Sequence, residues 1–274
     1  MKRLFPLLAL AALISILAAC GGGGGGSNDT SSTSAASSVP NPLVFCVDTT
    51  YPPAESIVNG KAEGYDIDIA NAVAKQLGST AQIKTTGFDV IIPALRQKKC
   101  DAIISSMTIT AERSKQVHFS PYLTVGTFLM VKKGNPSHIT DVASLSGKSA
   151  AVQASTTQLA ALEAENKTLK KQGKPEITIK SYPADTSAAA AIQAGKVDAY
   201  LADATPVLYY IRTTKGKFET AGKQVGIAPE GIATRLGDPL GAKINNAVQA
   251  LYLNGKMKSI LAKWQASQFA LQNK

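Results

Sequence analysis

The sequence predicts an α/β protein of two similar lobes that face each other across a cleft. Short apolar runs alternate with segments of helical periodicity, the order expected of parallel sheets with crossover helices. The plan also repeats, because residues 99–103 (KCDAI) match residues 196–200 (KVDAY) in pattern. About 230 residues follow the polar N-terminal stretch, enough for one large or two modest domains.

Apolar runs and turn residues divide the first half. A helix is expected after Gly64, closed by Gly78, and another over residues 90–95, with Val90 on its apolar face. Asn59-Gly60 indicates a hairpin. Strands are expected at 43–47, 81–84 and 102–104.

The second half follows the same order. A hydroxyl-rich run at 155–157 opens one helix, and Asp185 is expected to cap another that runs through Ala194. Residues 239–265 supply the last helices. Strands are expected at 127–131, 150–152, 177–179 and 197–201.

The first residues have the layout of a secretory signal peptide. Two cations precede an apolar run that ends at Ala19 and is somewhat short for a membrane span. Leu-Ala-Ala before Cys20 resembles the lipobox of bacterial lipoproteins, so residues 1–19 would be removed and Cys20 would carry lipid. Ordinary signal cleavage beside a stray cysteine is the alternative. Residues 20–41, rich in Gly, Ser and Thr, read as a flexible tether.

The charge balance is basic, with 29 Lys and Arg against 19 Asp and Glu. Loss of residues 1–19 would remove two cations and leave a net charge of +8. The lysines are scattered, and no basic stripe interleaved with aromatic residues appears, so we expect no nucleic-acid partner. The excess suits solubility or proximity to an anionic lipid surface.

Two cysteines remain after Cys20 is assigned to lipid. Cys46 lies in the first predicted strand and Cys100 directly before the strand that should neighbour it, so a disulfide is possible in an exported protein. Two buried thiols are the alternative. No metal-ligand spacing, phosphate-binding loop or Ser-His-Asp arrangement appears, and we expect no metal and no cofactor.

A hydroxyl cluster followed by an arginine marks the main candidate site. Ser105, Ser106 and Thr108 follow a predicted strand, and Thr110 has the position of an N-cap, which puts Arg113 in the first helical turn. A cation there is unfavourable because the helix N-terminus is already positive, so an anion should offset it. Hydroxyls, helix N–H groups and a guanidinium together suit a carboxylate. A solvated surface arginine is the alternative.

Several segments, in this order and spacing, resemble the amino-acid-binding proteins of ABC importers, bacterial solute-binding protein family 3. The resemblance covers residue 43 to about residue 269 and implies a periplasmic-binding-protein type II fold. Residues 42–126 plus 231–274 would form lobe 1 and residues 127–230 lobe 2, with crossings near 125–129 and 231–234. The segments are residues 64–69, 92–95, 101–113, 119–122 and 199–206.

The resemblance also implies where the two charged ends of an amino acid would bind. Arg113 would hold the α-carboxylate, helped by Ser106, Thr108 and the helix start at Ser155 and Thr156. Asp203, from the second lobe, would pair with the α-ammonium. Such an arrangement is physically sensible, because a zwitterion in a closed cleft loses hydration at both ends and needs both charges paired.

The other end of the site would receive the ligand side chain. The resemblance implies that Tyr51 and Phe88 sandwich it, and that Asp48 and Glu55 lie toward its tip. Core packing is the alternative for the two aromatic rings. From its place after the first strand we expect Asp48 to be an exposed acid. A cationic or polar L-amino acid is the expected ligand.

These expectations describe an exported, lipid-anchored, monomeric binding protein that delivers its ligand to ABC permease subunits. One rival is an enzyme, because cyclohexadienyl-dehydratase-like enzymes share the fold. Catalysis would need a general acid or base, and the two histidines, His118 and His138, read as surface or packing residues. Another rival is a sensor for a membrane receptor, which would have the same fold.

Overall fold

The computed structural model describes residues 38–271. The predicted signal peptide, Cys20 and most of the predicted tether lie outside these residues. Within the described range, no helix has the length and apolar character needed to cross a membrane.

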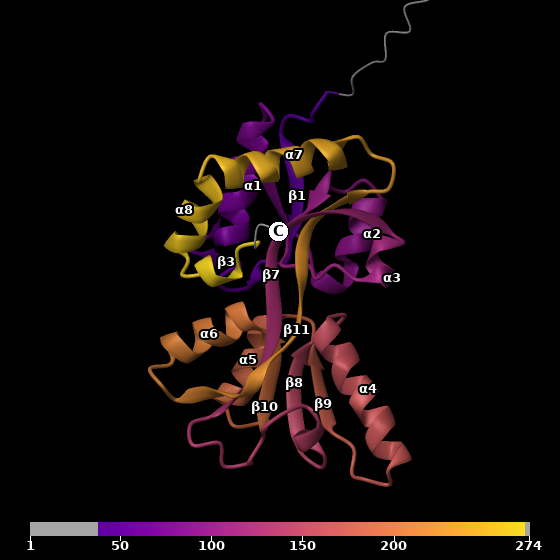
Figure 1. Cartoon of the computed structure of the whole chain (residues 1–274), viewed down its shortest axis with the longest axis vertical. Coiled ribbons are helices and arrows are strands. Elements are labelled where there is room, and N and C mark those ends of the chain that lie inside the picture. The colour runs from indigo at the N-terminus through magenta and orange to yellow at the C-terminus, as the bar shows by residue number, and fades with distance from the viewer. Residues whose placement is uncertain (1–37, 272–274) are drawn as a thin grey trace, which may run out of the picture. The chain divides into compact units, whose positions relative to one another are not determined.

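One eight-stranded sheet runs through this part of the chain, in the order β5-β1-β6-β11-β7-β10-β8-β9 (Figure 1). At its centre the two longest strands, β7 (Val117–Lys132) and β11 (Phe218–Arg235), pair antiparallel. The remaining strands are β1 (Leu43–Val47), β5 (Ala81–Thr85), β6 (Ala102–Ile103), β8 (Ser149–Gln153), β9 (Thr178–Tyr182) and β10 (Ala199–Asp203).

Helices cover the two ends of this sheet as separate groups (Figure 1). The first group packs near β1 and β5 and comprises α1 (Tyr65–Gln76), α2 (Ile91–Arg96), α3 (Ala111–Ser114), α7 (Leu240–Leu253) and α8 (Lys256–Lys263). The second packs near β8 and β10 and comprises α4 (Thr157–Lys171), α5 (Asp185–Gln193) and α6 (Ala204–Thr213).

A small second sheet follows β1. It is formed by β2 (Thr50–Tyr51), β3 (Glu55–Val58) and β4 (Lys61–Glu63), and the predicted hairpin at Asn59-Gly60 joins the last two. Both turn residues have positive φ, which explains the Asn-Gly pair. Gly64 then lies so close to Ala54 that a Cβ would be 1.8 Å from its carbonyl oxygen, so only glycine fits before α1.

The apolar core is divided between the two ends of the eight-stranded sheet. Two buried clusters draw on residues 43–125 and 232–269, with Ala204 added, and two draw on residues 129–221. The β7–β11 pair connects the two ends, and its register shifts between Ala221 and Val225, again before Ala228, and between Glu230 and Gly231. The lobe boundaries at 126/127 and 230/231 stay a prediction.

The internal repeat has a structural counterpart. Asp101 Oδ2 accepts a 2.9 Å hydrogen bond from the backbone N–H of Val44, the second residue of the neighbouring strand β1. Asp198 Oδ2 accepts an equivalent 2.8 Å bond from the N–H of Ser149. In each half, therefore, the aspartate of the repeat lies just before one strand and accepts a hydrogen bond from the N-terminal end of another, β1 in the first half and β8 in the second.

Two local expectations were wrong, and one expected strand is longer than predicted. Val90 is 51% exposed, because it ends a short 3-10 helix (Phe88–Val90) and α2, whose apolar face is buried, begins only at Ile91. Asp185 is the first residue of α5 rather than its cap, and its carboxyl is buried instead of bonding the helix N–H groups. The strand expected at 127–131 is the end of the 16-residue β7, since Val125 and Leu123 are buried as well.

Candidate ligand-binding site

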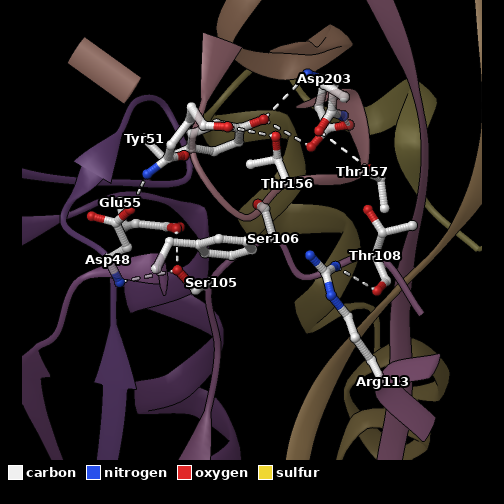
Figure 2. Close-up of a pocket in the computed structure, with 13 residues that line it drawn as sticks. Asp48, Tyr51, Glu55, Ser105, Ser106, Thr108, Arg113, Thr156, Thr157 and Asp203 are labelled. Carbon is white, nitrogen blue, oxygen red and sulfur yellow. Dashed lines mark hydrogen bonds between the residues drawn. The ribbon is translucent and has the colours of Figure 1, made fainter. Parts of the chain in front are cut away.

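A pocket lies between the two helix groups (Figure 2). Ten of the eleven residues expected at the site line it, which are Asp48, Tyr51, Glu55, Phe88, Ser105, Ser106, Thr108, Arg113, Thr156 and Asp203. Three further residues complete the lining, which are Gln153, Thr157 and Gln158.

Arg113 reaches the pocket from α3. As expected, Thr110 caps this helix, and its Oγ1 accepts a 3.1 Å bond from the Arg113 N–H. The guanidinium donates to the Thr108 carbonyl at 2.9 Å and to the Ser155 carbonyl at 3.1 Å, and it lies 5.4 Å from the centre of the Phe88 ring. Guanidinium has five N–H donors, so donors remain for a ligand.

Ser155 is the expected site residue that does not line the pocket. Its φ of 61° turns its backbone ahead of α4 so that its carbonyl meets Arg113 while the residue stays exposed. Thr156 takes the N-cap of α4 instead, where its Oγ1 accepts a bond of 3.2 Å from the Leu159 N–H. The hydroxyl run therefore opens the helix as predicted, but only its second and third residues line the pocket.

Asp203 is the last residue of β10 and is almost fully buried. Its two carboxylate oxygens accept bonds from Tyr51 Oη at 2.8 Å and from Gln158 Nε2 at 2.6 Å. Burial raises the pKa of Asp203 to about 6, against the lowering effects of the Tyr51 bond and the Arg113 charge. Tyr51 thus has a second role that the sequence did not suggest, because its hydroxyl links the first helix group to Asp203.

Asp48 lies at the end of the pocket opposite Arg113 and Asp203 (Figure 2). Only 4% of its surface is exposed, so the expectation of an exposed acid was wrong. Its Oδ1 accepts a 2.9 Å bond from Thr50 Oγ1, and its Oδ2 accepts a 2.5 Å bond from Gln153 Nε2. Its N–H donates to Ser105 Oγ at 3.0 Å, and that hydroxyl donates to Glu55 at 2.8 Å. Burial raises the pKa of Asp48 in spite of these bonds.

Glu55 and Asp66 form a buried acid pair behind this end. Glu55 Oε2 and Asp66 Oδ1 are both enclosed and accept no bond from a donor group of the described residues. Burial, followed by the charge of Asp66, raises the pKa of Glu55 well above its usual range. Asp66 is stabilised as a carboxylate by Ser106 N–H at 2.8 Å and Tyr122 Oη at 2.9 Å. A proton on Glu55 that bonds Asp66 satisfies both oxygens.

The surroundings of the pocket are strongly acidic. Arg113 is the single cation among the lining residues, whereas Asp48, Glu55 and Asp203 also line the pocket. Three more buried acids belong to the same part of the described structure, and they are Asp66, Asp185 and Glu230. Burial raises the pKa of Glu55, Asp185 and Glu230 far enough to keep these three acids protonated near neutral pH, so Asp48 and Asp203 are the lining acids that can carry negative charge beside Arg113. Among residues 38–271, no group of His, Cys, Asp or Glu is arranged to hold a metal ion.

Gln153, Thr157 and Gln158 are the lining residues that sequence reasoning missed. Gln153 ends β8 as Asp203 ends β10, so the rule that selected Asp203 applies to it as well. Gln158 lies in the first turn of α4 directly after the hydroxyl run, and its burial, which the sequence does not reveal, is what brings it into the pocket.

The disulfide regarded as possible from the sequence is present and joins Cys46 to Cys100. It connects β1 to the segment before β6, next to the buried residues Ile91 and Leu95. Asp48 follows Cys46 by two residues, so the bridge holds the strand that carries this end of the pocket.

We expect stability to fall as pH rises because of Asp185. Burial raises its pKa to about 8 from 3.8, and Tyr200 Oη donates to it at 2.5 Å while the charges of Asp48 and Asp203 disfavour ionisation. The folded state therefore binds a proton more tightly than the unfolded state, and this contribution is complete below pH 4 and lost toward pH 8. Melting temperatures of Asp185→Asn should decline less than those of the wild type over this interval.

Asp198 provides a control of opposite sign. Bonds from Ser149 and Ser137 lower its pKa although burial opposes them, so its contribution is present at neutral pH and lost in acid. Asp198→Asn should therefore be most destabilised near neutrality. Parallel melting curves for wild type and Asp185→Asn at every pH would contradict the role assigned to Asp185.

Comparison with known proteins finds one matching family and several similar proteins. A family model described as "Bacterial extracellular solute-binding proteins, family 3" matches residues 43–267. The chain is 32% identical over 235 residues to "ABC transporter arginine-binding protein 1" of Escherichia coli (strain K12), covering 80% of this chain and 89% of that protein.

Solved structures extend the likeness to the fold. "An ancestral arginine-binding protein bound to arginine" superposes with a TM-score of 0.75 and 36% identity, covering 82% of this chain and 99% of that chain. The ancestral amino-acid-binding protein AncCDT-1, described as a precursor of cyclohexadienyl dehydratase, has a TM-score of 0.73 and 33% identity, covering 82% and 95%.

Proposed function

Because the chain belongs to the bacterial extracellular solute-binding proteins, family 3, we propose that it captures an L-amino acid between two closing lobes and delivers it to an ABC importer. The observation that carries this proposal is that Arg113 and Asp203, from different helix groups, line one pocket. Arg113 would hold the α-carboxylate together with Thr108, and Asp203 would hold the α-ammonium. Because Arg113 and Asp203 come from different helix groups, both charges of the zwitterion are paired only when the two lobes have closed.

The ligand is proposed to carry a cationic or polar side chain. Its tip would lie near Asp48 and Glu55, and acids outnumber the single arginine of the lining. A cationic tip would offset the cost of burying Asp48. The names of the arginine-binding relatives support the same choice.

We propose that the mature protein is exported, monomeric and anchored through lipid on Cys20 to the outer face of the cell membrane. Family membership supports export, and Leu-Ala-Ala before Cys20 supports lipidation. Cleavage of residues 1–19 would leave residues 20–41 as the tether between membrane and lobes. Mass spectrometry of the membrane fraction should find a diacylated N-terminal Cys20, and an unlipidated, secreted chain would contradict this.

Binding is proposed to occur without turnover. The likeness to a precursor of cyclohexadienyl dehydratase makes catalysis worth testing, but His118 and His138 are both exposed and neither lines the pocket. After prolonged incubation the bound amino acid should be recovered unchanged by mass spectrometry. Stoichiometric loss of ligand would favour an enzyme.

A thermal-shift screen of the common L-amino acids tests the proposed function. Ligand at 100 times its dissociation constant should stabilise the protein by about 2.7 kcal/mol, which for a chain of this length raises the melting temperature by roughly 5–10 °C. We expect the largest shift with L-arginine, L-lysine or L-glutamine and little with D-arginine. No shift with any amino acid would contradict the proposal.

A further inference from the structure

The structure assigns a selectivity role to Gln153, which we infer accepts a hydrogen bond from the tip of the ligand side chain and so selects amino acids that end in an N–H donor. This inference rests on the proposed function. It concerns the end of the pocket farthest from the groups that would hold the α-carboxylate and α-ammonium.

The orientation of the Gln153 amide is fixed by its neighbours. Its Nε2 has two hydrogens, and they are directed to Asp48 Oδ2 at 2.5 Å and to the Pro183 carbonyl at 3.2 Å. Both neighbours are acceptors in this arrangement. Rotation of the amide by 180° would place Oε1 against two oxygens, so the observed orientation is the only one that bonds them.

The other polar atom of the side chain is then available to a ligand. Gln153 Oε1 accepts no hydrogen bond from the residues of the described range, and it is not among their enclosed polar atoms that lack a partner. Gln153 lines the pocket although the residue is only 3% exposed. The open atom at this end is therefore an acceptor, held rigidly by the two bonds on the nitrogen.

Asp48 strengthens the same preference. Both of its carboxylate oxygens already accept bonds, from Thr50 and from Gln153. It contributes negative charge to this end of the pocket, while Gln153 contributes the acceptor whose lone pairs are unused. A guanidinium, an ammonium or an amide NH₂ satisfies that acceptor, whereas a carboxylate tip would meet both an acceptor and a negative charge.

The decisive experiment compares two glutamines of the same pocket. Gln153→Met and Gln158→Met remove equally sized buried amides, but Gln158 bonds Asp203 and Thr127 at the α-ammonium end. Dissociation constants are measured by calorimetry for L-arginine, L-glutamine, L-glutamate and L-methionine. Melting curves of the ligand-free variants establish that each is folded.

Gln153→Met should weaken L-arginine and L-glutamine by roughly 10- to 100-fold, the value of a hydrogen bond to a buried acceptor, and leave L-methionine unchanged or tighter. Gln158→Met should weaken all bound ligands by similar factors, because it alters a group that every amino acid shares. A uniform loss in Gln153→Met as well would overturn the inference while leaving the proposed function intact. Failure of the wild type to bind any of the four would instead count against the proposed function.

A second variant keeps the inference testable if Gln153→Met does not fold. Gln153→Leu removes the acceptor with a smaller side chain, so it should lower the preference for L-glutamine over L-methionine at least tenfold relative to the wild type. An unchanged ratio of the two dissociation constants would overturn the assignment.

Discussion

Arg113→Ala is expected to abolish amino-acid binding while the ligand-free protein stays folded. A ligand carboxylate enclosed in the same pocket as Asp203 without its guanidinium would be left uncompensated, at a cost of about 3–5 kcal/mol, or more than 100-fold in affinity. Folding should persist because the guanidinium bonds only two backbone carbonyls, of Thr108 and Ser155. Calorimetry with the ligand found by the thermal-shift screen measures the loss.

Two further arginine variants define what the guanidinium contributes. Arg113→Lys keeps the charge but loses the planar fork and the contact with Phe88, so an intermediate affinity is expected. Arg212→Ala removes an exposed arginine of α6 that does not line the pocket and should bind as the wild type does. Unchanged affinity in Arg113→Ala would remove this residue from the site.

Loss of the Cys46–Cys100 disulfide should have the largest effect on stability. The two cysteines are 54 residues apart, and closing a loop of that length stabilises a protein by about 4 kcal/mol in the chain-entropy model, with measured values of roughly 2–5 kcal/mol. For a chain of this size the double variant Cys46→Ala/Cys100→Ala should melt roughly 8–16 °C lower. Differential scanning calorimetry provides the measurement.

Reduced wild type is the matched control for that variant. With dithiothreitol it should melt close to the double variant, and without reductant a thiol assay in denaturant should detect neither Cys46 nor Cys100. Ligand affinity well below the melting temperature should change little, because Asp48 remains bonded to Thr50 and Gln153. Two reactive thiols in the untreated protein would contradict the bridge.

The sequence predicted those parts of the site that local chemistry determines. Thr110 caps α3 and so orients Arg113, and Asp203 ends a buried strand, and both features can be recognised within a few residues. Contacts between distant segments could not be predicted in this way. The bond from Tyr51 to Asp203 joins residues 152 apart, and the bond from Gln153 to Asp48 joins residues 105 apart.

The errors in the predicted elements also come from contacts between segments that are distant in the sequence. Val90 fits the apolar face of a continuous helix, but the chain forms a short 3-10 helix first and leaves Val90 in solvent. Aspartate is a residue type that often caps helices, but Tyr200 from the neighbouring strand donates a hydrogen bond to the Asp185 carboxyl inside the core. In both cases packing by other segments overrode a local preference.

The final helices supply part of the core around the first strand. Ile244 and Val248 of α7 and Met257 of α8 belong to the same buried cluster as Leu43 and Phe45 of β1. The first and last segments of the described chain must therefore meet before this cluster can form, and such long-range contacts make completion late. A chain synthesised from its N-terminus can therefore complete this cluster only after α7 and α8 have left the ribosome.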